Sequence, residues 1–169
     1  QVAAEVKGFE EYALGAGLLE KREARHMAKF SQYAVATANE AWRDAGFDAE
    51  KKPDMNRVAT IFGVGIGGLE VTEDAFRPLF DKGPDRLSPL AIPELIANEG
   101  AGNVAIALGA KGPCHVLTTA CASSTDAIGY SIDLIRTGRA DVVVAGGAEA
   151  VIIEFTVGGF MKEKALSTS

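Results

Sequence analysis

The sequence has few of the residues that metal centres, disulfides and acid–base catalysis use most often. Its 169 residues include two Cys and two His. Cys114, His115 and Cys121 are close together, but His26 lies far upstream. The spacing of a structural zinc site, which needs four N or S ligands, is therefore missing. No signal peptide opens the chain, so a disulfide is not expected either, and both cysteines fit the description of small buried residues.

Charge and hydrophobicity exclude two further classes of protein. There are 17 basic and 23 acidic residues, a formal charge of −6, and no basic stripe, so nucleic acid is not an expected partner. The longest uncharged apolar run near the C-terminus, 142–148, is far shorter than the roughly 20 residues of a membrane span. Charged residues make up 24%, which is typical of a globular domain, and the length suffices for one core.

Glycine is abundant, at 19 residues, and four glycines form the turn GVGIGG at 63–68. The turn follows an expected strand at 57–62 and precedes an expected helix at 69–80. It matches G-x-G-x-x-G, with Asp81 and Asp85 about 20 residues on, and such a turn binds a dinucleotide pyrophosphate in Rossmann domains. The two acids lie around a Lys-Gly-Pro loop, however, and not at the end of a second strand. A nucleotide-binding α/β domain is thus one alternative, of a non-enzyme class.

Hydrophobic periodicity predicts a layered α/β domain. The apolar residues from 121 to 137 surround that helix almost completely, which predicts a buried helix, and the uninterrupted valines after Asp141 predict a strand buried on both faces of a parallel sheet. Neither 1–19 nor 158–169 has a pattern that completes a sheet, so we expect both ends to be cut. The further elements are expected as helices at 23–45, ended by Gly46, and at 88–108, and as strands at 115–119 and 141–145.

Cys121 lies where an expected strand runs directly into an expected helix, in TTACASS at 118–124. The first N–H groups of a helix have no intrahelical partner, and the helix dipole places partial positive charge there. Both effects favour a thiolate over a thiol. The same N–H groups can bind the oxyanion of a substrate carbonyl, as in a nucleophile elbow. Alternatively, Ser123 and Asp126 begin a capping box, and Cys121 is a buried residue just outside it. The residues alone leave both interpretations open.

A catalytic thiol also needs a proton acceptor, and the sequence offers no convincing one. His115 precedes Cys121 by six residues on an expected strand, which places it about 20 Å away. His26 lies on an amphipathic helix. Neither forms a Cys–His pair, so any catalytic base is expected outside these 169 residues.

The motif TACASS around Cys121, the stretch GRADVVVAGGAEA, and the later GGF and ALS resemble the N-terminal half of β-ketoacyl-acyl carrier protein synthases. The resemblance is strongest to the KAS II type of bacterial fatty acid synthesis, 3-oxoacyl-ACP synthase 2. It extends over almost the whole chain, because the earlier segments GVGIGGL, SPLAIPELIAN and GAKGP also occur in the same order as in the family. It implies a thiolase-like α/β/α fold with an incomplete sheet. Residues 1–169 would be a partial N-terminal domain that lacks the first strand and the C-terminal half.

The resemblance also implies the roles of four residues. Cys121 would be the nucleophile that takes the acyl chain as a thioester, and its own N–H would form one arm of the oxyanion hole. Ile66 would line the acyl pocket and limit chain length, Phe160 would be a gate beside the cysteine, and Leu69 would line the same pocket. Without the resemblance, Ile66 and Phe160 would be interpreted as core residues.

The reaction implied is acyl transfer to Cys121, followed by decarboxylative Claisen condensation with malonyl-ACP in fatty acid elongation. Phosphopantetheine would arrive on the acyl carrier protein, so no resident cofactor and no metal are expected. The implied partners are acyl carrier protein and a second copy in a homodimer, whose interface would include the strand before Cys121 and the helix around Ala101. The implied compartment is the cytoplasm.

Two histidines, a lysine and a second oxyanion-hole N–H that the family carries in its C-terminal half have no counterpart here, so the chain alone is expected to be inactive. Three alternatives within this fold remain. They are a ketosynthase of polyketide synthesis, a thiolase-like acyltransferase that uses coenzyme A thioesters, and a non-catalytic partner subunit. Subunits of the last kind typically lack the cysteine that is present here as Cys121.

Overall fold

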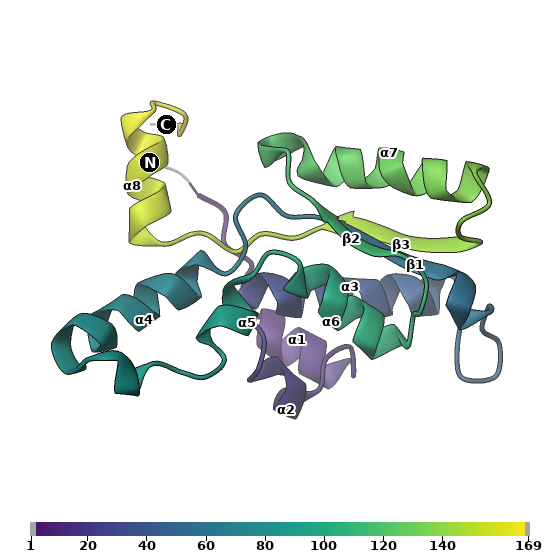
Figure 1. Cartoon of the computed structure of the whole chain (residues 1–169), viewed down its shortest axis with the longest axis horizontal. Helices are drawn as coiled ribbons and strands as arrows, with labels where there is room; N and C mark the ends of the chain where they lie inside the picture. The colour runs from purple at the N-terminus through teal and green to yellow at the C-terminus, as the bar shows by residue number, and fades with distance from the viewer. Residues whose placement is uncertain (1–2, 168–169) are drawn as a thin grey trace.

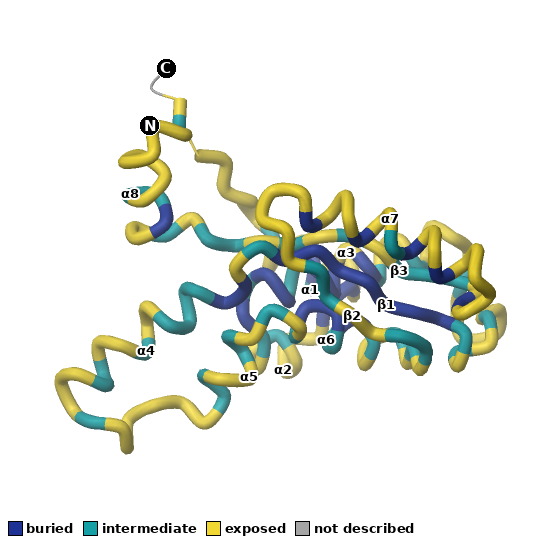
Figure 2. The backbone as a smooth tube through the Cα atoms, turned by 45° about the horizontal axis from the view of Figure 1, so that its top comes forward, coloured by how far each residue is buried: buried dark blue, intermediate teal, exposed yellow. Residues whose placement is uncertain are grey.

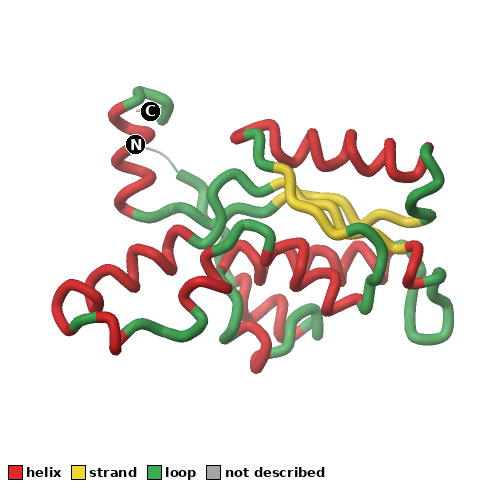
Figure 3. The backbone as a smooth tube through the Cα atoms, in the orientation of Figure 1, coloured by secondary structure: helices red, strands yellow, loops and turns green. Residues whose placement is uncertain are grey.

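The computed structural model describes residues 3–167 and shows a layered α/β arrangement (Figure 1, Figure 3). Helix α7 covers one face of a parallel sheet, and α3 and α6 cover the other. The strands, in the spatial order β2-β1-β3, are β1 (Val58–Gly63), β2 (Cys114–Leu117) and β3 (Val142–Gly147). The helices are α1 (Phe9–Gly15), α2 (Lys21–Ala24), α3 (Lys29–Asp44), α4 (Leu69–Lys82), α5 (Ala91–Leu95), α6 (Glu99–Leu108), α7 (Ser123–Arg136) and α8 (Glu154–Lys162), with 3-10 turns η1 (Met55–Arg57), η2 (Pro84–Arg86) and η3 (Ala120–Ala122).

Strand β1 is the central strand of the sheet. All six of its residues are buried, and it pairs in parallel with both neighbours, so that Thr60 lies opposite Cys114 on one side and Val144 on the other. Parallel strands need a crossover connection, and helices supply it here. The predicted parallel sheet is confirmed. The valines of β3 are only partly buried, however, because β3 is an edge strand of the sheet within the described residues.

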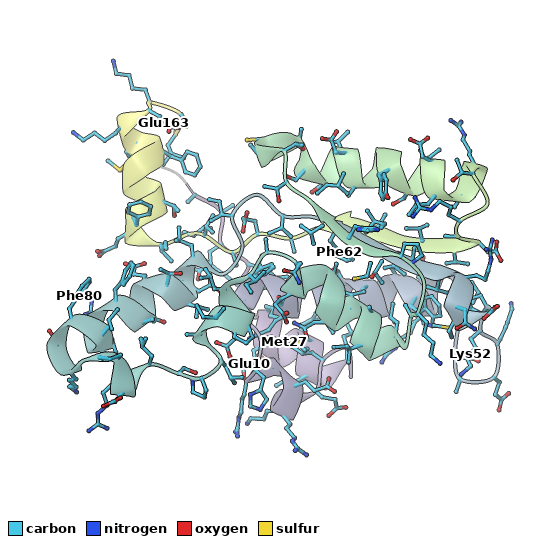
Figure 4. All side chains as sticks on the ribbon, in the orientation of Figure 1. Glu10, Met27, Lys52, Phe62, Phe80 and Glu163 are labelled. Carbon is cyan, nitrogen blue, oxygen red and sulfur yellow. The ribbon has the colours of Figure 1, made fainter. Side chains whose placement is uncertain are left out.

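The face of the sheet below β1 in Figure 1 packs on α3 and α6. Phe62 is 3% exposed and lies between the sheet and these helices (Figure 4). Helix α3 buries Phe30 and Ala34, and α6 approaches them closely because it carries small residues: a Cβ at Gly100 would stand 3.2 Å from the Phe30 ring. The small residues of α6 therefore allow close packing against α3.

Helix α7 buries only one face, although the sequence predicts burial all round. Ser123, Ala127, Ser131 and Leu134 face the sheet, at the three- and four-residue spacing of one helix face. The outward Ile128, Ile132 and Ile135 are 44–52% exposed, and Figure 2 shows α7 as an exposed outer helix. The periodicity prediction was wrong here because no described residues cover that face. No helix in the described part of the chain has both the length and the apolar content needed to cross a membrane.

Two predicted helices are interrupted. The pattern over 23–45 splits at 25–28, where the side chain of Gln32 donates to the carbonyls of Ala24 and Met27. The pattern over 88–108 splits after α5, because the carbonyl of Leu95 accepts a hydrogen bond from the N–H of Gly68 instead of a helical one. The end at Gly46, in the left-handed region at φ +77°, is as predicted. Helices α1 and α8, of seven and nine residues, were not predicted.

A partly buried carboxylate joins two of these helices. Glu70, in the first turn of α4, accepts a hydrogen bond from the N–H of Lys29 at 2.9 Å and so ties it to the start of α3. Its other oxygen is buried without a hydrogen-bond partner in the described part of the protein. Burial raises the pKa of Glu70, against the opposing effect of its hydrogen bonds, and the nearby charges of Glu149 and Asp74 raise it further.

The carboxyl ends of β1 and β3 lie directly against the first turn of α7. A Cβ added at Gly63 would stand 2.2 Å from the carbonyl carbon of Ser123, and one at Gly147 would stand 1.8 Å from Oγ of Ser124. At Gly63 the backbone of α7 already occupies the space, and at Gly147 the side chain of Ser124 occupies it. Part of the glycine excess in the sequence therefore serves this close approach.

We expect Gly63→Ala to lower the free energy of unfolding by about 3 kcal/mol or more, because the new methyl group would overlap the backbone of α7. Chemical denaturation of the protein measures this loss. Gly146→Ala is the matched control, since its Cβ would stand at an ordinary 3.5 Å from the Phe62 ring. Equal stability of the two variants would contradict the close approach.

We expect the stability contribution of Glu70 to fall as pH rises. Because its pKa is raised in the folded protein, the folded state binds the proton more tightly than the unfolded chain. The free energy of unfolding therefore decreases from the ordinary glutamate pKa up to the raised one. In thermal melts, Glu70→Gln should gain stability relative to the parent as pH rises from the ordinary glutamate pKa to the raised one. The exposed Glu73→Gln is the control, and a pH-independent difference for Glu70→Gln would refute this cause.

Candidate active site

The chain bends sharply between β2 and α7. Ala120 has a φ of +52°, in the left-handed region that residues other than glycine rarely adopt. The hydroxyl of Ser123 stabilises the bend, since it accepts a hydrogen bond from the N–H of Thr119 at 2.9 Å and donates one to the carbonyl of Ala120 at 2.6 Å. The hydroxyl of Thr118 donates to the carbonyl of Val64 at 2.9 Å, which joins the bend to the glycine turn.

These contacts correct the expected capping box. The N-cap position of α7 is Ala122, and within the described residues no side chain caps this terminus. Ser123 is the first residue of the helix, and its hydroxyl is used by the preceding bend, so it cannot also bind the N–H groups of the first turn with Asp126. The N–H of Ser123 donates to the carbonyl of Ala120, and no described side chain offsets the positive end of the α7 dipole.

Cys121 occupies the middle of the 3-10 turn η3, two residues before α7, and is exposed. The prediction of a thiol at a strand-to-helix junction is confirmed, with a short 3-10 turn in place of a direct helix start. The carboxyl ends of the strands lie near the start of α7, and α8 stands to the left of both (Figure 1, Figure 3). An exposed thiol beside the start of a helix is accessible to an electrophile.

A cavity of about 410 Å³ opens at Cys121. Ile66 of the glycine turn and Phe160 of α8 line it together with Cys121, so the structure brings three of the four predicted site residues into one place. Its remaining walls come from the sheet ends and from the bend, among them Gly63, Gly147 and Ala120. Ile66 and Phe160 are 43% and 40% exposed, which argues against interpreting them as core residues.

Leu69 lies elsewhere. It lines a second cavity, of about 290 Å³, together with Phe76 of α4 and with Ile153 and Phe155 from the start of α8. The expectation that Leu69 shares a cavity with Cys121 is therefore wrong for this structure. Leu69 is the first residue of α4, and that helix lines the second cavity with the segment that leads into α8.

Glu149 is a residue of this cavity that we did not predict. It follows β3, and its carboxylate accepts hydrogen bonds from the N–H of Ile66 at 2.7 Å and of Gly67 at 3.1 Å. A dinucleotide phosphate would need these same N–H groups as hydrogen-bond donors. The negative charge of the carboxylate would also repel the phosphate. Asp81 and Asp85 lie at the end of α4 and in η2. The geometry thus disfavours the nucleotide-binding alternative.

Neither histidine lines the cavity. His115 is in β2 opposite Ile61, and its ring packs edge-on against Tyr130 of α7, with ring centroids 5.8 Å apart. His26 follows α2, in the turn before α3. Over residues 3–167, no group of three His, Cys, Asp or Glu side chains is arranged to hold a metal ion.

Comparisons with known proteins find one matching family and several similar sequences. The family described as "Beta-ketoacyl synthase, N-terminal domain" matches residues 2–169. A 3-oxoacyl-[acyl-carrier-protein] synthase 2 of Staphylococcus aureus is 43% identical over 151 residues, which are 89% of this chain and 37% of that protein. One of the same name from Synechocystis sp. is 40% identical over 163 residues, which are 96% of this chain and 38% of that protein. The chain thus spans less than two fifths of the length of these relatives.

Solved structures show the same fold. A β-ketoacyl synthase from Burkholderia phymatum matches with a TM-score of 0.74 and 28% identity, over 88% of this chain and 36% of that one. A type II polyketide ketosynthase in complex with its acyl-carrier protein matches with a TM-score of 0.82 and 24% identity, over 90% and 44%. The fold is therefore the thiolase-like α/β fold of ketosynthases, as the resemblance implied. From its family match and its relatives, the chain belongs to the β-ketoacyl synthase family, in the part that forms the N-terminal domain.

Proposed function

We propose that Cys121 is the nucleophile of a 3-oxoacyl-ACP synthase and that this chain provides its acyl-accepting site. The observation that carries the proposal is an exposed thiol in a strained bend before α7, opening into a cavity with Ile66 and Phe160. In this proposal the Cys121 thiolate attacks the carbonyl carbon of an acyl thioester. The carrier thiol leaves and takes up a proton, and the acyl group remains on Cys121 as a new thioester.

Stabilisation of the oxyanion follows from the same geometry. The N–H of Cys121 is the proposed first arm of the oxyanion hole, and the dipole of α7, which no described side chain caps, adds positive potential at this end of the helix. A carbonyl oxygen that becomes negative during attack is favoured there. The second arm is proposed to come from the rest of the parent protein, as the family resemblance implies.

The second half of the proposed reaction is a condensation. A malonyl thioester loses CO₂, and the resulting carbanion attacks the carbonyl carbon of acyl-Cys121. The product is a β-ketoacyl thioester, and Cys121 is released as a thiolate. Because neither His26 nor His115 lines the cavity, we propose that groups outside this chain assist decarboxylation and that the 169-residue chain alone does not condense.

Ile66 and Phe160 are the proposed walls of the acyl site. Ile66 would limit the length of the acyl chain, and Phe160 would act as a gate beside Cys121. The lining of the cavity supports both roles. A role for Leu69 in the same site has less support, since Leu69 lines the second cavity.

The proposed partners follow from the family. Phosphopantetheine would arrive on an acyl carrier protein, so the chain itself would hold no cofactor, and the active protein would be a homodimer in the cytoplasm. A polyketide ketosynthase solved with its acyl-carrier protein supports a carrier-protein partner. Fatty acid elongation is favoured over polyketide synthesis because the 43% identical relative is a 3-oxoacyl-ACP synthase 2, whereas the likeness to that polyketide enzyme rests on 24% identity.

We expect iodoacetamide to alkylate Cys121 faster than Cys114 near neutral pH. Both thiols are exposed, but only Cys121 lies beside the positive end of α7. Peptide mass spectrometry after short labelling times measures the two rates in one sample. Equal labelling of the two thiols would contradict an activated nucleophile.

We expect Ile66→Phe to shorten the longest acyl chain that Cys121 accepts, because the larger side chain reduces the cavity. Acylation of the full-length protein by a medium-chain thioester should slow by about tenfold relative to acetyl transfer, which corresponds to about 1.4 kcal/mol. The control is Ile92→Phe, the same change at a side chain of α5 that is 64% exposed and does not line the cavity. An unchanged chain-length profile in Ile66→Phe would remove Ile66 from the acyl site.

A further inference from the structure

We propose that Glu149 is a positioning residue, which fixes Ile66 beside Cys121 and so takes part in the choice of acyl chain length. The proposal rests on the proposed function, because it acts on the same acyl site. It concerns two residues that are 83 positions apart in the sequence and are joined by direct hydrogen bonds.

The carboxylate of Glu149 binds the glycine turn with both of its oxygens. One accepts from the N–H of Ile66 at 2.7 Å, and the other accepts from the N–H of Gly67 at 3.1 Å. Two hydrogen bonds to adjacent N–H groups fix the direction of the peptide between them, which a single bond would leave free to turn. Glu149 also lines the cavity of Cys121, so this contact is made within the site itself.

The opposite side of the turn is held by the end of α5. The N–H of Gly68 donates to the carbonyl of Leu95 at 3.1 Å. A Cβ at Gly67, where φ is +93°, would stand 3.0 Å from that carbonyl oxygen, and one at Gly65 would stand 3.0 Å from Oε2 of Glu149. The turn therefore fits closely between α5 and Glu149, and Ile66 is the residue at its centre that carries a large side chain.

The chemistry of the contact selects a carboxylate. Two adjacent N–H donors need two acceptor atoms, and an ionised glutamate has only acceptors. Glutamine has the same length but offers one acceptor and one NH₂ donor, so one N–H of the turn would face another donor. Aspartate keeps both acceptors but is one methylene shorter. The turn released in either variant would hold Ile66 less firmly against a long acyl chain.

The test uses Glu149→Gln in the full-length protein, with Cys121 acylation by acetyl and decanoyl thioesters as the readout. We expect the decanoyl-to-acetyl ratio of acylation rates to rise about tenfold, which is near the lower end of the loss expected from one hydrogen bond to a charged group. Glu163→Gln is the matched control, because Glu163 lies at the outer end of α8, away from the sheet (Figure 4), and should leave the ratio unchanged.

A double-mutant cycle separates positioning from a general structural effect. In an Ile66→Ala background the side chain that Glu149 positions is absent, so Glu149→Gln should change the ratio by less than about twofold. An undiminished effect in that background would overturn the proposal. Should Glu149→Gln fail to fold, Glu149→Asp takes its place in the same cycle, with an intermediate change expected.

Amide hydrogen exchange gives a readout that needs no acylation. Exchange at Ile66 and Gly67 should become at least about tenfold faster in Glu149→Gln than in the parent or in Glu163→Gln. Unchanged exchange, or faster exchange with an unchanged acyl-length ratio, would overturn the proposal. A parent that accepts no thioester would overturn the proposed function and the acyl-length role with it, while exchange would still decide whether Glu149 holds the turn.

Discussion

The contact on which the site depends is that between the first turn of α7 and the carboxyl ends of β1 and β3. At Gly63 the sheet touches the backbone of α7, and at Gly147 it touches the side chain of Ser124, so that a Cβ at either position would meet atoms of α7. This contact brings the end of β2, the bend at Ala120 and the thiol of Cys121 to the edge where the other two strands also end. A larger residue at Gly63 would displace the start of α7 and, with it, the nucleophile.

The cavity forms at the edge of the sheet where the carboxyl ends of the three strands lie. Parallel strands that end together deliver their connecting loops to one place, and here those loops carry Ile66 after β1, Cys121 after β2 and Glu149 after β3. Phe160 then reaches the cavity from α8. The site therefore combines a thiol beside the positive end of a helix with an apolar wall, an arrangement that suits an acyl group. Its one carboxylate is used to hold a turn.

Much of the framework could be predicted from the residues. Periodicity located β1, α4, α7 and the parallel arrangement, and it located the thiol at the strand-to-helix junction. It failed where a contact from elsewhere competes with a local one. The hydroxyl of Ser123 stabilises the bend instead of capping α7, and the carbonyl of Leu95 bonds to Gly68 instead of continuing a helix. It also overestimated the burial of α7, because an apolar pattern does not show what covers it.

The sequence by itself determined the strand–bend–helix order that exposes Cys121, because these elements depend on neighbours within a few residues. The motif around that thiol also carried the resemblance to the ketosynthase family. The tertiary structure alone decided that Ile66 and Phe160 share a cavity with Cys121, that Leu69 lines another, and that Glu149 binds the glycine turn. The physical reason is that these contacts join residues up to 94 positions apart, from Ile66 to Phe160. Which distant residues meet depends on strand pairing and helix packing, and local patterns do not contain that information.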